Sequence, residues 1–244
     1  MLLNIESINI ASAFETEWHD HSWGQLYWLD NGVINVETEQ AQWVITPGSV
    51  GWTPADCLHK VKIFPSVQLY VIDLDCSGLG LFPQQPGVYA MNSLLRALLS
   101  RASEFSAADF ASDYVTSLIK LLGHEVMRLQ ALPLGLPLPT DRRARNIAES
   151  LLEHPANTYT QDEMAKKWGL SVRTLSRIFI NQTGFTYSQW RQQSKIITSM
   201  RFIQQGLPIS EVASLSGYTN VSAFIEAFRL RFGDTPGKFR AKIA

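Results

Sequence analysis

Three histidines near the N-terminus have the residue type and spacing needed to hold a metal ion. His19 and His21 are two positions apart and Gln25 follows four positions later, so these three side chains would share one face of a strand. His59 would join them from a neighbouring strand. Three imidazoles with an open coordination position suit zinc, iron or nickel. Because the amide of Gln25 is a poor ligand, a second interpretation stays open, in which the same side chains line a pocket for an organic molecule.

Tryptophans surround these histidines. Five of the seven in the chain lie at positions 18, 23, 28, 43 and 52. Aromatic side chains line many small-molecule pockets and equally fill the cores of small barrels. The candidates for a ligand pocket are His19, His21, Gln25, Trp28 and His59, and the candidates for a metal site are His19, His21 and His59. Cys57 and Cys76 lack a strongly basic environment, which predicts inert thiols.

The C-terminal half holds two copies of one pattern. In each copy an alanine stands four positions before a glycine, and a phenylalanine, a glycine and a threonine follow; the alanine and first glycine repeat at an offset of 48 residues and the other three at an offset of 49. The matching residues are Ala165 and Gly169 with Ala213 and Gly217, and Phe179, Gly184 and Thr186 with Phe228, Gly233 and Thr235. The alanine allows two helices to pack closely and the first glycine allows a left-handed turn between them. The pattern therefore predicts two helix-turn-helix units.

Helix start signals agree with this prediction. The expected capping residues are Thr160 with Glu163, Ser171, Thr186 with Gln189, and Asn220. Thr186 would begin a longer helix, about 187–204, that joins the two units. Helical period places Leu175, Ile178 and Phe179 on the core side of the first unit and Phe224, Ala227 and Phe228 on the core side of the second.

The outward residues of these helices could contact DNA. Candidates for contacts with base edges are Arg173, Ser176, Arg177, Val221, Ser222, Ile225 and Glu226. Arginine can bond guanine O6 and N7 together, and a carboxylate can accept from cytosine N4. Candidates for phosphate contacts, which position a protein without carrying sequence information, are Arg142, Arg143, Lys167, Arg191 and Arg229, and with them Arg145, Lys166 and Lys195. Any one of these exposed residues is equally compatible with a solvated surface.

The charge is divided in the same way as the motifs. Residues 1–140 hold 6 Lys and Arg against 14 Asp and Glu, a net charge of −8, whereas residues 141–244 hold 15 against 8, a net of +7. A basic half favours contact with a polyanion. The whole chain, with 244 residues of which 45% are hydrophobic and 18% charged, has an ordinary globular composition, which excludes a disordered chain, a fibre or a coiled-coil rod.

The elements expected to position these residues fall into two domains of an α+β fold. Short strand-like runs at residues 25–29, 33–37, 42–45, 49–53, 58–64 and 68–74 predict a barrel or sandwich over residues 1–90. A helical arm is expected over 91–131, with helices at about 92–102 and 107–131. The second helix would have an apolar face formed by Tyr114, Leu118, Leu121, Leu122 and Val126. The proline-rich segment 132–140 predicts a linker, and 141–244 an all-α domain.

The C-terminal half resembles the DNA-binding domain of the AraC family of bacterial transcription regulators. The motifs that carry the resemblance are Met164-Ala-Lys-Lys-Trp-Gly-Leu-Ser-Val-Arg-Thr-Leu-Ser-Arg-Ile-Phe179, Ile209-Ser-Glu-Val-Ala-Ser-Leu-Ser-Gly-Tyr218, and Phe224 through Phe232-Gly-Asp-Thr-Pro-Gly-Lys-Phe-Arg240. The resemblance implies that the outward residues of both second helices occupy base-reading positions. The acidic Glu226 departs from the polar or basic residue often found there.

The N-terminal half resembles the cupins, small β-barrels whose histidines and a glutamate bind metals. The resemblance rests on His19-Asp-His21, Gln25 and Gly32, followed by Gly48, Pro54 and His59. Gln25 stands where enzymatic cupins have the glutamate. In the AraC family such a barrel commonly binds a small effector, and the helices after it commonly dimerise the regulator. Packing of the helical arm on the chain's own barrel is the alternative.

These observations predict a sequence-specific transcription regulator and not an enzyme. Its expected partners are double-stranded promoter DNA and a small effector; contact with RNA polymerase and a homodimer stay open, and no membrane partner is expected. No cofactor is expected apart from the metal ion considered above. The alternatives are a metal-dependent cupin enzyme or metal sensor that uses His19, His21 and His59, and a constitutive DNA-binding protein whose barrel only dimerises. With no apolar segment of roughly 18–20 residues, no secretion signal and two cysteines, a cytoplasmic location is expected.

Overall fold

The computed structural model describes residues 2–76 and 80–243, and these form two compact units. The first, here called the β-unit, comprises residues 2–38 and 43–135. The second, the helical unit, comprises residues 39–42 and 136–242. Within the described residues, no helix combines the length and the apolar character that a membrane span requires.

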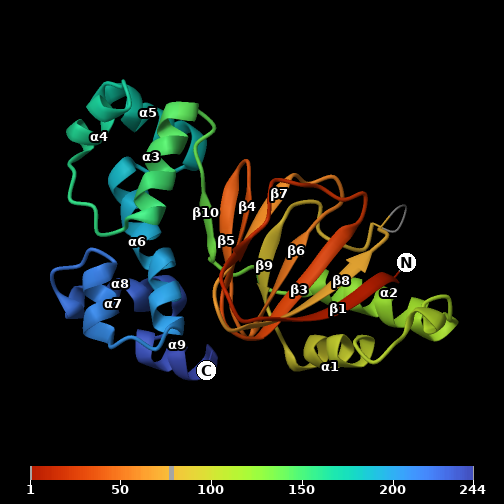
Figure 1. Cartoon of the computed structure of the whole chain (residues 1–244). Helices are drawn as coiled ribbons and strands as arrows, with labels where there is room; N and C mark the ends of the chain where they lie inside the picture. The colour runs from red at the N-terminus through yellow and green to blue at the C-terminus, as the bar shows by residue number, and fades with distance from the viewer. Residues whose placement is uncertain (1, 77–79, 244) are drawn as a thin grey trace. The chain divides into compact units, whose positions relative to one another are not determined.

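Two five-stranded antiparallel sheets dominate the β-unit (Figure 1). The first sheet has the order β1-β8-β3-β6-β9 and the second the order β10-β5-β4-β7-β2. The strands are β1 (Leu2–Ile10), β2 (Phe14–Glu15), β3 (Gly24–Asn31), β4 (Ile34–Thr38), β5 (Ala41–Ile45), β6 (Ser49–Thr53), β7 (His59–Ile63), β8 (Val67–Leu74), β9 (Gly87–Ala90) and β10 (Gly135–Pro137). This is the cupin-like arrangement that the sequence predicts, and strands β3 to β8 are its six expected runs.

Strand β3 shows how alternation divides the β-unit into two interiors. Leu26 and Trp28 point to one face of the first sheet, where they join the main hydrophobic core. Gln25 and Tyr27, at the alternate positions, line a cavity on the other face. Gly51 of β6, which pairs with Tyr27, leaves room for the tyrosine ring, since a Cβ atom there would lie 2.0 Å from Cε2 of that ring.

Helices α1 (Ser93–Ala102) and α2 (Asp113–Arg128) cover the core face of the first sheet (Figure 1). A short 3-10 helix, η1 (Ala107–Asp109), lies between them. Leu118, Leu122 and Val126 of the predicted apolar face are buried in the same core as Trp28. The chain's own sheet therefore covers this stripe, and it is not free to dimerise the protein.

The predicted apolar face of α2 is wrong at two positions. The side chains of Tyr114 and Leu121 are 57% and 44% exposed. Val115 and Ile119 are buried in their place, because the helix is rotated so that its face toward the sheet runs through these two positions.

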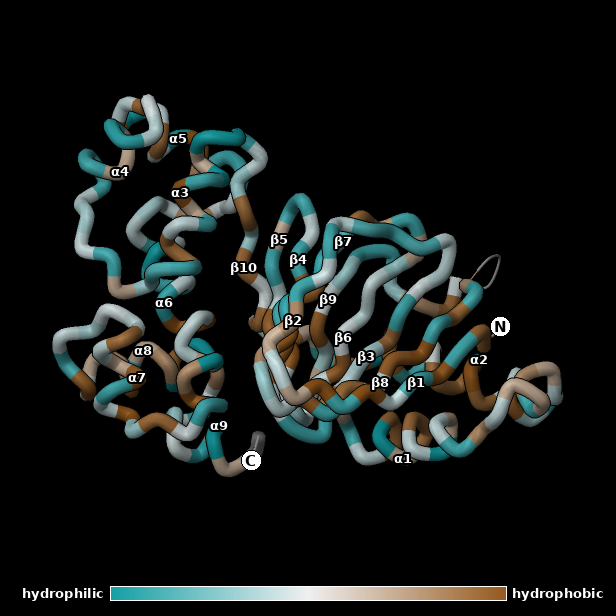
Figure 2. The backbone as a smooth tube through the Cα atoms, in the orientation of Figure 1, coloured by the Kyte–Doolittle hydropathy of each residue, from teal (hydrophilic) through white to brown (hydrophobic). Residues whose placement is uncertain are grey.

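The helical unit contains α3 (Arg142–Glu153), α4 (Gln161–Lys167), α5 (Val172–Thr183), α6 (Tyr187–Gln204), α7 (Ile209–Leu215), α8 (Val221–Phe232) and α9 (Pro236–Ile243). All of the predicted caps are present: Thr160 and Thr186 form capping boxes with Glu163 and Gln189, and Ser171 and Asn220 accept from backbone N–H groups of α5 and α8. Figure 2 shows hydrophobic and hydrophilic residues alternating along these helices, as expected for helices with one buried face.

The proline-rich segment 132–140, predicted as a linker, contains the division between the two units. It is an ordered part of the fold, because β10 forms within it and Leu134, Leu136 and Leu138 are buried.

Candidate nucleic-acid interface and histidine cluster

Two helix-turn-helix units of matching construction form in the helical unit. The first, HTH1, consists of α4 and α5, and the second, HTH2, of α7 and α8; the paired helices have the same lengths, 7 and 12 residues. Gly169 and Gly217, in the turns between the helices, have φ angles of +69° and +78°. Gly184 and Gly233 end α5 and α8 with φ angles of +75° and +77°. The predicted left-handed turns are therefore confirmed.

The second helix of HTH1 presents two arginines outward. Leu175, Ile178 and Phe179 are buried, as predicted, while Arg173 and Arg177 on the opposite side are exposed. Among the described residues, neither guanidinium has a recorded hydrogen bond or ion pair within the chain, so both are available to an external acceptor. Ser176 is half-buried between them, and its hydroxyl accepts a hydrogen bond from Gln161 Nε2 at 2.8 Å.

The second helix of HTH2 has a different chemical character. Val221, Ser222 and Glu226 are exposed, and Ile225 is half-buried. Because α5 and α8 have the same length and start 49 residues apart, Glu226 occupies the position that Arg177 has in HTH1. An anion thus replaces a cation at equivalent positions, which disfavours phosphate and guanine at this point of the second unit.

Some of the candidates for phosphate contact are exposed, and others are bonded within the protein. Arg142, Lys167 and Arg229 are exposed. Arg143 is also exposed, but its guanidinium lies 3.5 Å from Asp141 and donates to the Gly169 carbonyl at 3.3 Å.

Arg191 is engaged inside the protein. Its guanidinium donates to the carbonyl oxygens of Asn157 and Tyr159, and we therefore reassign it from phosphate contact to support of this loop. The lysines of the wider set are also engaged: Lys166 pairs with Asp162 at 2.7 Å, and Lys195 donates to the Gly217 carbonyl at 2.8 Å. Arg145 pairs with Glu149 at 3.0 Å.

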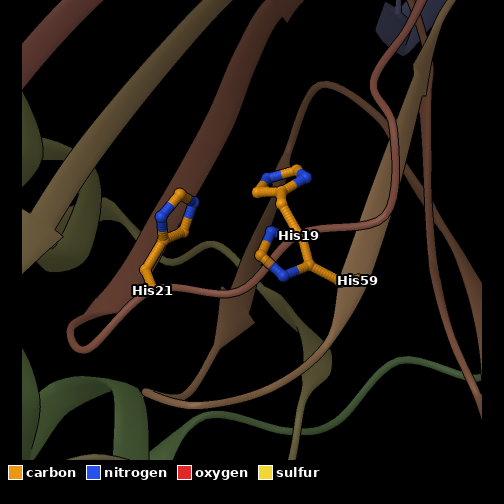
Figure 3. Close-up of side chains that lie close together, drawn as sticks. All are labelled: His19, His21 and His59. Carbon is orange, nitrogen blue, oxygen red and sulfur yellow. The ribbon is translucent and has the colours of Figure 1, made fainter.

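The three predicted histidines converge in the β-unit. Figure 3 shows His19 and His21 on the loop that precedes β3, and His59 on strand β7. Their candidate ligand nitrogens all lie within 4.8 Å of one another. His19 and His21 are not in the regular strand that the spacing predicts; instead, His19 reaches β7 through a single bridge in which its N–H and the N–H of His59 each donate to the other's carbonyl.

Backbone carbonyls orient two of these rings. The Nδ1 atom of His19 lies 2.8 Å from the Glu17 carbonyl, and Nδ1 of His59 lies 2.8 Å from the Cys57 carbonyl. An Nδ1–H that donates to a carbonyl leaves Nε2 as the ligand atom, which is the usual arrangement of metal-binding histidines. The Nε2 atom of His59 is buried and has no recorded partner, and the residue is 1% exposed.

Burial disfavours the protonated form of two of these rings. Desolvation lowers the pKa of His59 and of His21 below the ordinary value for histidine, and the neighbouring His19 adds to the lowering in both. A lowered pKa favours the neutral form of His21 and His59, whose lone pairs can bind a cation. Burial also raises the pKa of the Cys57 and Cys76 thiols, in line with their predicted inertness.

A cavity of about 560 Å³ lies beside this cluster, inside the β-unit. Its lining is mostly apolar, with His19, Gln25, Tyr27 and Thr16 among the few polar groups; the apolar members include Ile10, Phe14, Val36, Val61 and Leu69. The lining contains no Asp, Glu, Lys or Arg side chain. Tyr27 donates to or accepts from Thr53 Oγ1 at 2.7 Å, and burial raises the pKa of its hydroxyl, which therefore stays protonated.

The predicted pocket residues separate in the structure. His19 and Gln25 line the cavity, but His21 and His59 belong to the cluster beside it. Trp28 is corrected: it stacks on Tyr70 with ring centroids 4.9 Å apart and packs in the core on the opposite face of the sheet. The amide of Gln25 donates to the Asp73 carboxylate at 2.9 Å. Tyr27 was missed, although strand alternation from Gln25 places it on the same face.

Comparison with known proteins places these features among regulators. A model of a helix-turn-helix domain matches residues 164–242. The HTH-type transcriptional regulator NimR of Escherichia coli K12 is 26% identical over 225 residues, which cover 92% of this chain and 82% of NimR. The HTH-type transcriptional regulator RipA of Corynebacterium glutamicum is 37% identical over 103 residues, which cover 42% of this chain but only 31% of RipA. Among solved structures, ToxT from Vibrio cholerae O395 aligns over 99% of this chain and 98% of its own, with 13% identity and a TM-score of 0.44.

Proposed function

Since the chain belongs to the AraC family of DNA-binding transcription regulators, we propose that an uncharged, largely apolar effector occupies the β-unit cavity and controls promoter recognition by HTH1 and HTH2. Arg173 and Arg177 supply the main base contacts in this proposal. Ser176, Val221, Ser222, Ile225 and Glu226 form the rest of the base-reading surface, and Arg142, Arg143, Lys167 and Arg229 contact phosphates. A homodimer and a contact with RNA polymerase belong to the same proposal.

The observation that carries the effector proposal is the cavity. At about 560 Å³ it falls within the size range of small-molecule sites, which is roughly 300–1,000 Å³. A carboxylate or an ammonium buried among these residues would lack an ion-pair partner in the lining, and burial of an unpaired charge is costly. A molecule with one hydroxyl, carbonyl or amide has suitable partners in Gln25, Tyr27 and His19.

Control of DNA binding requires that the effector bind two states of the chain with different affinity. The cavity wall contains the β1–β2 connection at residues 11–13, which is exposed, as well as the central strands. We expect effector binding to order this wall and so to stabilise one state over the other. A ligand with equal affinity for both states would not change promoter occupancy.

The first prediction concerns this cavity. In a panel of apolar molecules of about 10–20 non-hydrogen atoms, each uncharged member paired with a carboxylate of the same skeleton, we expect uncharged members to stabilise the full-length protein. At 100 times its Kd a ligand contributes about 2.7 kcal/mol, which raises the midpoint of thermal unfolding by several degrees. The same members are expected to change the Kd for promoter DNA.

A matched pair of variants tests whether the ligand lies in the cavity. Val61→Phe fills it, because Val61 lines it, whereas Leu58→Phe adds the same ring at an exposed position nearby that is outside the lining. Stabilisation should disappear in Val61→Phe and persist in Leu58→Phe. Stabilisation by the carboxylates alone, or undiminished stabilisation of Val61→Phe, would contradict the proposal.

A metal sensor is the second candidate function, and the buried, unpartnered Nε2 of His59 favours it. The candidate nitrogens lie within 4.8 Å of one another, and nitrogens bound to a tetrahedral zinc ion are about 3.4 Å apart. The residues present fit a three-histidine site in which His19, His21 and His59 would hold the ion, and His19 also lines the cavity. When bound, the ion would act as a Lewis acid toward a ligand oxygen or nitrogen.

The second prediction tests this site. We expect the full-length protein to bind one Zn²⁺ or Ni²⁺ per chain, measured by calorimetry on protein freed of metal by a chelator. His59→Gln should weaken this binding by at least about tenfold, since it removes one of three ligands. His124→Ala, which removes an exposed histidine of the same unit, serves as the control. Equal affinity in His59→Gln and the control, or no binding by the wild type at millimolar metal, would eliminate the metal sensor.

A further inference from the structure

The two helix-turn-helix turns are equivalent in sequence but differ in their surroundings. A Cβ atom at Gly169 of HTH1 would have no heavy atom within 4 Å. At Gly217 of HTH2 it would lie 2.7 Å from the carbonyl oxygen of Pro155 and 3.0 Å from Cα of Ala156. The turn of HTH2 therefore packs directly against residues 155–156, which belong to the loop that leads into HTH1. Only glycine permits this approach of backbone to backbone.

Helix α6 fastens both sides of this contact. Arg191 donates to the carbonyl oxygens of Asn157 and Tyr159 in the loop before HTH1. Lys195, one helical turn further along, donates from Nζ to the carbonyl of Gly217 at 2.8 Å. One face of a single helix thus holds the entry loop of HTH1 and the turn of HTH2.

The neighbours of Lys195 strengthen its hold. Its ammonium lies 5.5 Å from the centroid of the Tyr218 ring, and the Tyr218 hydroxyl donates to Gln192 Oε1 at 3.1 Å. Lys195 is half-buried, and burial lowers its pKa below the ordinary value for lysine. The nearby charge of Arg191 also lowers this pKa, so the bond to the Gly217 carbonyl and the contact with the Tyr218 ring are the interactions that favour the ammonium at this position.

A short connection also joins HTH2 to α6. HTH2 follows α6 through the short segment 205–208, where Gly206 has a φ of +77° and a Cβ atom there would have no heavy atom within 4 Å. The Gly206 N–H donates to the Ile203 carbonyl at 3.0 Å, and the Arg240 guanidinium of α9 donates to the Leu207 carbonyl in the same segment. The orientation of HTH2 therefore depends on this connection, on its packing against α6 and on the contacts around Gly217.

We infer that a group of five residues fixes the separation and phase of the two recognition helices and so specifies the spacing of the two half-sites in the DNA. This group, here called the HTH clamp, consists of Pro155, Asn157, Arg191, Lys195 and Gly217. This inference rests on DNA recognition by both helix-turn-helix units. Major-groove segments on one face of DNA lie about 34 Å apart, and each added base pair moves one half-site by about 3.4 Å and rotates it by about 35°. A clamped pair cannot follow that displacement, whereas a hinged pair can.

The test uses the full-length protein and a DNA site obtained by in vitro selection, into which one or two base pairs are inserted between the half-sites. We expect the wild type to bind the one-base-pair insertion at least about tenfold more weakly than the selected site. Lys195→Met keeps the apolar stem and removes the ammonium. In this variant the loss of affinity caused by the insertion should be about threefold smaller than in the wild type, and the Kd for the selected site should change by less than that. Lys195→Arg, which can still donate to the carbonyl, should restore the wild-type spacing profile.

Lys238→Met is the matched control, because Lys238 is exposed on α9 and its loss removes the same charge outside the clamp. The glycine pair gives a second readout: Gly217→Ala should broaden the spacing profile and Gly169→Ala should not, although both strain a left-handed turn. Identical spacing profiles for Lys195→Met and Lys238→Met would overturn the inference, as would a wild type that tolerates the insertions. A selected site with only one half-site would contradict recognition by both units, which is a distinct result.

Discussion

Replacing both Arg173 and Arg177 by alanine is expected to weaken binding to the native operator by about 2–6 kcal/mol while leaving the fold intact. A bidentate contact from arginine to guanine O6 and N7 discriminates by about 1–3 kcal/mol. Both guanidinium groups are exposed on α5 and have no recorded partner among the described residues, so their removal breaks no internal contact. The loss should therefore appear in DNA binding and not in stability.

The measurement is the Kd for operator and for scrambled DNA over a range of salt. If the arginines contact bases, the double variant should lose more affinity for the operator than for scrambled DNA, and its specificity ratio should fall. If they contact only phosphates, both affinities should fall together and the salt slope should decrease by about one per arginine. The double variant Arg96→Ala with Arg128→Ala removes the same charge from exposed positions of the β-unit and controls for net charge. Unchanged operator affinity would remove both residues from the interface.

The two units are expected to contribute unequally to this binding. HTH1 presents Arg173 and Arg177, whereas the position in HTH2 equivalent to Arg177 is Glu226. A carboxylate is repelled by phosphates and restricts direct contact to donors such as cytosine N4. We therefore expect HTH2 to contribute less to base recognition than HTH1, and its contribution depends on its being held at a fixed distance from HTH1. The clamp around Gly217 supplies this condition.

The helical unit could be predicted from sequence in detail because its signals are local. Each cap is a side chain bonded to a backbone group two or three residues away, as Thr160 is to Glu163, and each turn glycine acts through its own φ angle. The repeat also gave each signal twice. What sequence could not show is the contact of Gly217 with Pro155, because 62 positions separate the two residues and nothing in the repeat distinguishes Gly217 from Gly169.

The β-unit was less predictable because its information is long-range. Strand β1 was missed: its residues are mostly exposed or half-buried, and only its pairing with β8 makes it a strand. Strand β10 was missed because two of the prolines that indicated a linker flank or end it. The histidine pattern was recognised, but the regular strand assumed for His19 and His21 does not form. The rings converge because the loop reaches β7 at His59.

The cavity shows the limit of pattern analysis most clearly. The frequency of tryptophan in ligand pockets predicts that Trp28 lines the cavity, yet its position next to Tyr27 on β3 makes it face the other way. Alternation predicts which residues share a face, but it does not predict which face is covered by helices and which encloses a cavity. That choice was made by α1 and α2, whose apolar stripes cover the Trp28 face.

Phe179→Ala and Phe228→Ala are expected to destabilise the helical unit by about 3–5 kcal/mol each, the cost of replacing a fully buried phenylalanine by alanine. Both side chains are 0% exposed and occupy equivalent positions in α5 and α8. Phe179 makes edge-on contacts with Tyr187 and Trp190, at 5.3 Å between centroids in each case. Phe228 lies 4.6 Å from Phe232 and 5.4 Å from Phe239.

The measurement is denaturant unfolding of the full-length protein followed by circular dichroism at 222 nm, where the helical unit dominates the signal. Leu230→Ala is the control, because Leu230 lies on α8 but is 88% exposed, and its loss should change stability by less than about 0.5 kcal/mol. Phe179 contacts the start of α6, which carries the clamp, whereas Phe228 packs within HTH2 and against α9. We therefore expect Phe179→Ala to weaken DNA binding at every spacing, and Phe228→Ala to spare the HTH1 contacts. A cost below about 1 kcal/mol for either variant would mean that the unit repacks around the loss, and that the aromatic cluster does not hold the recognition helix in place.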